Sequence, residues 1–220
     1  MNQHRFAFSF ALIAALLVAV PATGQLVGYP VFAIPSGDGD ASTTGALQWV
    51  RGLNSDSGEN AGFAAYGVRS MERISFAVAV GRLIGDIDEF TFGGTVAYHL
   101  LRDGGDAQIS VQAGVGYMAQ SSIGDVPLPN GDMTTMNFPI GVAFEARPSE
   151  FGRIWLMPRL NLFRVSDDVT SKTRKQLGFS LGASISSEGG FGIHAGLDFV
   201  DLKDSAPLIG AIGFHYTLPN

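Results

Sequence analysis

The chain has 220 residues, a formal net charge of −6, 15% charged residues, 29 glycines and no cysteine. Soluble domains carry roughly 25% charged residues, so the composition argues against an ordinary soluble enzyme, and the acidic balance excludes the basic stripe of a nucleic-acid-binding protein. The absence of cysteine excludes disulfide bonds and zinc–thiolate sites.

The first residues have the pattern of an export signal peptide. A short basic start precedes the apolar run 6–20, and small residues suited to cleavage follow it. A retained membrane helix is the alternative, but the run is shorter than the about 20 residues that span a bilayer. We predict that residues 1–24 are removed, and that residues 25–44, rich in Pro, Gly, Asp and Ser, form a periplasmic lead-in to a barrel domain at 45–220.

Ten later segments alternate between apolar and small or polar residues. Such alternation indicates β-strands, because successive side chains of a strand point to opposite faces. Clusters of Gly, Asp, Asn, Ser and Pro separate the segments and are typical of turns and loops. The predicted strands are residues 46–54, 62–69, 74–84, 91–101, 107–118, 135–146, 153–165, 175–185, 191–200 and 208–218.

The clearest alternation lies in the predicted hairpin at 175–200. Its odd-numbered positions carry apolar residues such as Leu177 and Phe199, whereas its even-numbered positions carry mainly Gly and Ser, with His194 and Asp198 among them. In a soluble sheet the face opposite the core is usually strongly polar, and neither face of this hairpin is. An apolar face opposite a small, mildly polar face is typical of a closed barrel in a bilayer, with the apolar face toward lipid.

The connections between the predicted strands also alternate. Those after odd-numbered strands are polar and often long, and those after even-numbered strands are tight up to the eighth. Outer-membrane barrels have this asymmetry, with long loops outside the cell and short turns in the periplasm. We therefore predict an all-β fold, an up-and-down antiparallel transmembrane β-barrel of ten strands with both termini in the periplasm.

Two prolines complicate this prediction. Pro139 and Pro158 fall inside predicted strands, where each removes a hydrogen-bond donor from the ladder. Bulges would accommodate them. The alternative is a barrel of eight full strands with an irregular wall at these two positions.

In this architecture, residues 45–220 resemble the small outer-membrane β-barrel proteins, a broad group described as porin-like or as outer-membrane-protein β-barrel domains. The resemblance implies a place in the bacterial cell outer membrane, insertion by the barrel-insertion machinery, and contact with outer-membrane lipid and lipopolysaccharide. Many members of this group end in an aromatic residue. Here Phe214 and Tyr216 keep the alternation, whereas the last three residues depart from it.

If the apolar face meets lipid, the ionisable residues of opposite parity face the lumen. A lipid-facing Lys or Arg at the bilayer midplane costs about 2–4 kcal/mol, which supports this placement. The predicted lumenal polar residues are His99, Glu145, Arg159, His194, Asp198 and His215. Arg159 and Glu145 lie on neighbouring predicted strands, and we expect them to form an interior ion pair with a structural role.

Three of these residues suggest an enzymatic alternative. His194 and Asp198 lie four residues apart on one face of a strand, and His215 has the same parity on the next strand. Outer-membrane proteases and lipid-modifying enzymes use such residues, so a hydrolase acting on lipid or peptide is an alternative. No nucleophile motif accompanies them, which favours a hydrogen-bonded lumen without catalytic residues. We expect no metal site and no cofactor.

The aromatic residues near strand ends divide by parity. Tyr98, Tyr117 and Tyr216 have lipid-facing parity, where aromatic rings favour the membrane interface. Trp155 and Phe163 have lumenal parity, so either a bulge turns one of them outward or both fill the interior.

The interpretation that accounts for most of these patterns is a monomeric, non-enzymatic integral outer-membrane barrel with a structural, adhesive or narrow-pore role. A barrel of about ten strands is narrow enough for side chains to fill much of its interior. A secreted soluble β-barrel that binds a hydrophobic ligand is a further alternative, and it requires the apolar face to point inward. No nucleic-acid partner is expected.

Overall fold

The computed structural model of the protein describes residues 42–54, 61–85, 88–102, 107–123, 126–127, 132–201 and 206–219. The predicted signal peptide lies outside the described residues, as does most of the predicted lead-in. Among the residues described, no helix is long and apolar enough to cross a membrane.

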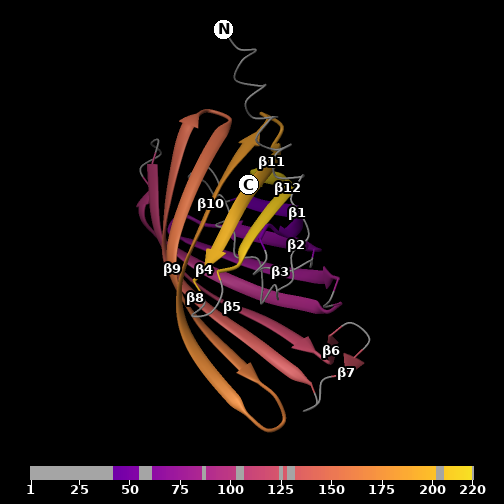
Figure 1. The fold of residues 1–220 in the computed structure, drawn as a ribbon. Coiled ribbons are helices and arrows are strands. Elements are labelled where there is room, and N and C mark those ends of the chain that lie inside the picture. Colours follow the sequence, from indigo (N-terminus) through magenta and orange to yellow (C-terminus); the bar gives the residue numbers. More distant parts are fainter. Residues whose placement is uncertain are drawn as a thin grey trace.

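Ten strands form one closed, antiparallel barrel (Figure 1). Each pairs with its neighbours along the chain, and the first strand pairs with the last to close the wall. The barrel strands are β1 (Ser42–Gly52), β2 (Ala61–Ser70), β3 (Ile74–Ile84), β4 (Phe90–Arg102), β5 (Ala107–Gln120), β8 (Met133–Ser149), β9 (Gly152–Ser166), β10 (Ser171–Ser186), β11 (Phe191–Val200) and β12 (Leu208–Pro219). The prediction of a ten-strand up-and-down barrel is confirmed, and the eight-strand alternative is wrong.

The observed strands differ from the predicted ones mainly at their ends. β1 begins at Ser42, so the last three residues of the predicted lead-in belong to the barrel wall. The predicted loop between the fifth and sixth barrel strands contains a short hairpin of two more strands, β6 (Ser122–Ile123) and β7 (Val126–Pro127).

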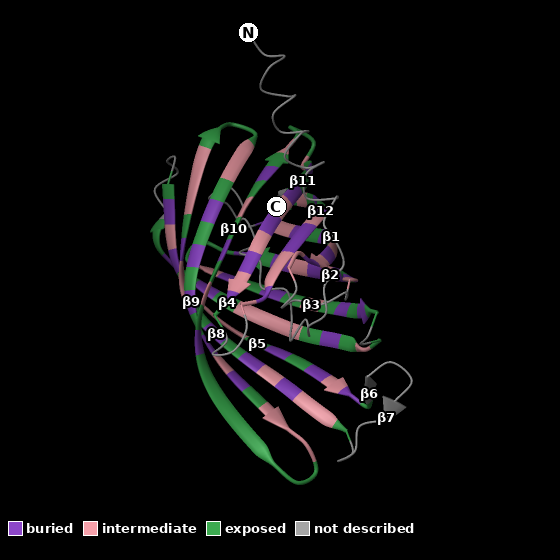
Figure 2. Ribbon diagram, in the orientation of Figure 1, coloured by how far each residue is buried: buried purple, intermediate pink, exposed green. Residues whose placement is uncertain are grey.

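The side chains face the directions that the alternation predicts. Figure 2 shows buried and exposed residues alternating along the strands. On β10 and β11, Phe179, Leu181 and Ile193 are exposed on the outside, whereas Ser180 and Asp198 are buried inside. The apolar parity therefore faces outward, as an integral membrane barrel requires and opposite to a soluble barrel.

Pro139 interrupts one ladder without shifting its register. The β5–β8 pairing is continuous up to Ala113–Ile140 and resumes at Gly116–Asn137 in the same register. Because proline has no N–H to donate, the β5–β8 ladder loses pairing between these two pairs.

Pro158 has the same effect on the β8–β9 ladder, which pauses between the pairs Gly141–Arg159 and Phe144–Leu156. Neither proline therefore needs a bulge. The two register shifts of the barrel lie elsewhere, between His99 and Leu101 and between Ala146 and Ser149.

The two ends of the barrel differ in their connections. One end, called here the short-turn end, carries the tight connections 71–73, 150–151 and 187–190. In the last of these, Gly190 has φ of +81°, a conformation that glycine adopts without strain. At the opposite, long-loop end, the β9–β10 hairpin projects from the lower end of the barrel in Figure 1.

Candidate functional site

The inner face of β10 consists of small residues from Gly178 to Ser186, and larger side chains of the flanking strands lie over it. A Cβ added at Gly182 would overlap the indole of Trp155, which belongs to β9. A Cβ added at Gly178 would come within 2.9 Å of Asn161 Nδ2. The glycines of the predicted hairpin therefore provide space for side chains that cross the neighbouring strand.

Arg159 and Asp198 form a buried ion pair across this small face. Arg159 Nη1 lies 2.6 Å from Asp198 Oδ1, and Arg159 Nη2 donates to Asp198 Oδ2 at 2.7 Å. The two side chains are 1% and 7% exposed. Arg159 belongs to β9 and Asp198 to β11, so the pair spans β10, where Gly178 and Ser180 lie opposite them. Arg159 Nε also donates to Asn161 Oδ1 at 3.0 Å, which holds the guanidinium in place.

The expected ion pair between Arg159 and Glu145 is wrong. The β8–β9 register places Arg159 opposite Gly141, and it places Glu145 opposite Trp155. Glu145 instead contacts Arg153, whose Nη1 donates to Glu145 Oε1 at 3.4 Å. Among the described residues, the interior thus contains the pairs Arg159–Asp198 and Arg153–Glu145 at different heights, in place of the expected Arg159–Glu145 pair.

A chain of four polar side chains crosses the short-turn half of the interior. Tyr66 Oη and His194 Nε2 lie 3.0 Å apart, His194 Nδ1 and His215 Nδ1 lie 3.3 Å apart, and His215 Nε2 and Ser186 Oγ lie 2.9 Å apart. A neutral imidazole has one N–H and one acceptor nitrogen. With both rings neutral, every hydrogen bond can therefore be donated in the direction from Tyr66 toward Ser186, or every one in the reverse direction. In both cases each of the three contacts has one donor and one acceptor.

Glycines on adjacent strands accommodate the two imidazoles. A Cβ at Gly213 would come within 2.7 Å of the His194 ring, and one at Gly192 would overlap the His215 ring. Both rings therefore lie against the wall beside a glycine, as the indole does at Gly182. The interior therefore repeats one arrangement, in which a large inward side chain lies over a glycine of the neighbouring strand.

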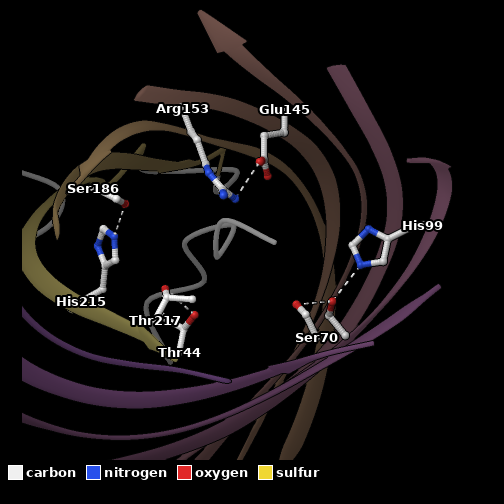
Figure 3. Close-up of polar contacts among 9 residues, drawn as sticks. Thr44, Ser70, His99, Glu145, Arg153, Ser186, His215 and Thr217 are labelled. Atoms are coloured by element: carbon white, nitrogen blue, oxygen red, sulfur yellow. Dashed lines mark hydrogen bonds and ion pairs between the residues drawn. The ribbon is translucent and has the colours of Figure 1, made fainter. Parts of the chain in front are cut away.

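A further polar group lies on the other side of the short-turn end. Ser75 Oγ is 2.7 Å from His99 Nε2 and 2.9 Å from Ser70 Oγ. Figure 3 shows this group, the Glu145–Arg153 pair and the Ser186–His215 contact pointing inward from different parts of the wall. Polar contacts therefore surround this end of the lumen.

The structure places all the predicted lumenal residues on the inner face, but it does not bring the proposed catalytic three together. His194 and His215 are in contact, whereas Asp198 is occupied by Arg159. Sequence reasoning missed Ser186 and Tyr66. Ser186, Gly192 and His215 lie in one row across β10, β11 and β12. The register that the tight 187–190 turn imposes on β10 and β11 was therefore the sequence signal that could have placed Ser186 near His215.

Apolar side chains from distant parts of the wall meet inside the barrel. Ile209 of β12 packs against Leu83 of β3 and Met118 of β5. Trp155 and Met157 pack together with Ala143, and Ala79 of β3 packs against this cluster although three strands separate β3 from β9. Trp155 and Phe163 are both buried, so both fill the interior, which resolves the question left open by their parity.

Several buried polar atoms around the ion pair have no hydrogen-bond partner among the described residues. They include Asn161 Nδ2, Ser180 Oγ and Gln176 Oε1, whose side chains face inward beside Arg159. Buried polar groups in proteins are normally satisfied by protein or water, so this part of the interior is polar rather than oily. Within the described part of the chain, no three His, Asp or Glu side chains come together to hold a metal ion.

Large apolar side chains cover the outside of the barrel. Every barrel strand contributes at least one exposed apolar residue, examples being Leu47, Phe63, Val78, Phe92, Val115, Ile140, Leu156, Leu177, Phe191 and Phe214. Soluble monomers rarely expose apolar patches larger than a few hundred Å². A closed barrel of even strand number with such an exterior is an integral barrel of the bacterial outer membrane.

Comparison with solved structures finds barrels of this kind. The N-terminal β-barrel domain of Pseudomonas aeruginosa OprF is 10% identical, with a TM-score of 0.43 over 82% of this chain and 99% of that one. Yersinia pestis Ail in a phospholipid bilayer nanodisc is 12% identical, with a TM-score of 0.44 over 81% and 100%. The translocator domain of the autotransporter NalP from Neisseria meningitidis is 12% identical, with a TM-score of 0.43 over 85% and 90%.

Neither a family model nor a curated protein matches the sequence. The class of the protein therefore follows from its own fold and exterior: it is a small outer-membrane β-barrel.

Proposed function

We propose that this protein is a non-enzymatic outer-membrane barrel with a structural or adhesive role, and that its own side chains close the lumen to solutes. The observation that carries the proposal is the contact of side chains from distant strands, with Ile209 against Leu83 and Met118, and Ala79 against the Trp155 cluster. An open pore needs a continuous aqueous path, and these contacts lie across it.

The polar residues of the interior support the same role. Arg159 and Asp198 pair with each other inside the wall, and the side chains of the histidine chain form a separate set of hydrogen bonds there. Hydrogen bonds and ion pairs in a buried, low-dielectric interior favour the one arrangement of strands in which they form. They provide internal cross-links between strands that are not neighbours.

The test is single-channel recording of the purified protein in planar bilayers. We expect little or no conductance. Large, stable current steps would contradict a closed lumen. A gel of boiled and unboiled samples serves as the control for folding, because a folded barrel resists cold detergent and migrates differently after boiling.

The proposed partners are outer-membrane lipid, lipopolysaccharide and the barrel-insertion machinery, with the barrel acting as a monomer. The last strand supports recognition by that machinery because Phe214 and Tyr216 face outward and are exposed, and Leu218, where we expected the alternation to end, is exposed on the same face. Truncation after Thr217 tests whether the final apolar position contributes to insertion, with the yield of heat-modifiable protein in the outer membrane as the measurement.

One observation favours a second candidate, a hydrolase acting on lipid or peptide. Ser186, His215 and His194 are linked in the order nucleophile, base and orienting group, provided that Ser186 donates to His215. This set replaces Asp198 of the sequence-based alternative with Ser186. A fluorophosphonate probe distinguishes the candidates, since labelling that is lost in Ser186→Ala and in His215→Ala would support the hydrolase, and absence of labelling would support the non-enzymatic barrel.

A further inference from the structure

The β9–β10 hairpin concentrates positive charge in an otherwise acidic chain. Four of the 14 Lys and Arg residues lie between Arg164 and Lys175, although the net charge is −6. All four are exposed, the others being Lys172 and Arg174. Figure 2 shows the exposed stretch of β10 at the projecting end of this hairpin.

These cations have no carboxylate partner among the described residues. Arg164 Nε donates to Ser171 Oγ at 3.2 Å, and its terminal nitrogens have no partner in the part of the chain that the structure describes. The nearby Asp167 at the tip is engaged by its own turn, where it accepts hydrogen bonds from the backbone N–H groups of Val169 and Thr170. By contrast, Arg82 near the same end of the barrel is paired with Asp88.

The four cations divide between the two faces of the hairpin. Arg164 and Lys175, called here the outer pair, share the outward parity of Leu160 and Leu177, which are 38% and 68% exposed. Lys172 and Arg174, called the inner pair, have the opposite parity. The inner pair therefore points toward the axis of the barrel, and the outer pair points toward the surrounding membrane.

The outer pair lies at the edge of the apolar exterior on the long-loop side of the barrel. Lys175 precedes Leu177 by two residues on the outer face, a separation of about 7 Å at the usual strand spacing. Arg164 is opposite Thr173, so it is a diagonal neighbour of Lys175. Diagonal neighbours are about 7–8 Å apart, which lets two long side chains converge on one group. Hydroxyls of Ser171 and Thr173 lie on the same face.

We propose that the outer pair binds a phosphate group of an outer-leaflet lipid, with the Ser171 and Thr173 hydroxyls as additional donors. This inference rests on the proposed outer-membrane location, because only there does the apolar edge place these side chains at headgroup depth. Guanidinium and ammonium groups are the usual ligands of phosphate, and their charge-assisted hydrogen bonds are strong. Lysines on a strand edge also discourage pairing with another strand. That role would require charge on either face of the hairpin equally, whereas a lipid phosphate can be reached only from the outer face.

The test compares two variants with the same loss of charge. Arg164→Gln/Lys175→Gln removes the outer pair, and Lys172→Gln/Arg174→Gln removes the inner pair. Each protein is folded in octyl glucoside and titrated with dioleoyl phosphatidic acid, and native mass spectrometry measures the bound lipid. The outer variant should bind at least about tenfold more weakly, as expected for lost charge-assisted hydrogen bonds, and the inner variant should stay within about twofold of the wild type.

Equal loss in both variants would overturn the inference, because it would show that only total charge matters. Unchanged binding in the outer variant would overturn it as well, as would full displacement of the lipid by millimolar inorganic phosphate. The gel of boiled and unboiled samples distinguishes failure of the phosphate site from failure of the proposed outer-membrane barrel. A wild-type protein that shows the heat shift but binds no lipid contradicts the phosphate site alone, whereas a protein that needs no detergent contradicts the membrane barrel itself.

Discussion

Two arginine–aspartate pairs of this barrel have nearly the same geometry and lie in opposite surroundings. Arg159 and Asp198 make contacts of 2.6 and 2.7 Å inside the barrel, with side chains 1% and 7% exposed. Arg82 and Asp88 make contacts of 2.8 and 3.0 Å at the long-loop end, with side chains 53% and 56% exposed. Because water can replace either partner of the exposed pair and neither partner of the buried pair, burial decides what each pair contributes.

The largest effect is expected where one partner of the buried pair is removed. Asp198→Ala leaves the Arg159 guanidinium buried without a counter-charge, and breaking a buried pair in this way costs about 3–5 kcal/mol. Urea unfolding of the barrel from lipid vesicles measures the change. A loss below about 1 kcal/mol would show that the interior is as well solvated as the surface.

Replacing both partners of the buried pair should restore most of that loss. Arg159→Met/Asp198→Leu removes the charges together, and apolar residues of similar volume often match or exceed a buried pair in stability. We expect the double variant to unfold at a urea concentration closer to the wild type than to Asp198→Ala. A double variant that is no more stable than the single one would mean that the polar surroundings, including Asn161, require the charges.

The small face beneath the buried pair provides the next largest effect. Gly178→Ala places a Cβ against Phe199 O at 2.6 Å and Asn161 Nδ2 at 2.9 Å. Overpacking of this kind costs about 1–3 kcal/mol. Gly45→Ala is the matched control, because nothing lies within 4 Å of a Cβ at that position. Equal effects of the two substitutions on the unfolding midpoint would argue against the role of the small face.

A neutral contact in the interior should cost less than the buried charges. Ser186→Ala removes only the hydrogen bond to His215 Nε2, and a neutral hydrogen bond contributes about 0.5–1.5 kcal/mol. The same urea measurement gives the value. A loss as large as that of Asp198→Ala would show that the histidine chain, and not the ion pair, is the main support of the interior.

The comparison also shows which features the sequence could predict. Strand number and the facing of each side chain follow from the period of two, because a residue's own parity determines its face. The parity of Arg159 did not predict its ion-pair partner, because the partner depends on the register between strands. Glu145 is on the adjacent strand but lies opposite Trp155, whereas Asp198 is two strands away. It is within reach only because the inner face of β10 is small at Gly178 and Ser180.

The same limit applies to the histidine chain. His194 and His215 were predicted to share the lumen, but Tyr66 belongs to a strand far away in the sequence and reaches His194 across the interior. Closure of the barrel brings β2 and β11 within reach of each other, since only β12 and β1 lie between them. A pattern within one strand of the sequence cannot predict a contact between two strands that barrel closure brings together.

The smallest effect is expected at the exposed pair, and it is visible only in the titration of Asp88. The hydrogen bond from Arg82 holds the pKa of this carboxyl below its ordinary value. A depressed pKa means that the contact is fully present above the ordinary Asp range near pH 4 and is lost as the pH falls through the lowered pKa.

Arg82→Gln should raise the pKa of Asp88 toward the ordinary value without a measurable change in the unfolding midpoint. An NMR titration of the Asp88 carboxyl in micelles measures the shift, and Arg69→Gln on another strand is the control that should leave it unchanged. If Arg82→Gln destabilised the barrel as much as Asp198→Ala, burial would not be what separates the two pairs.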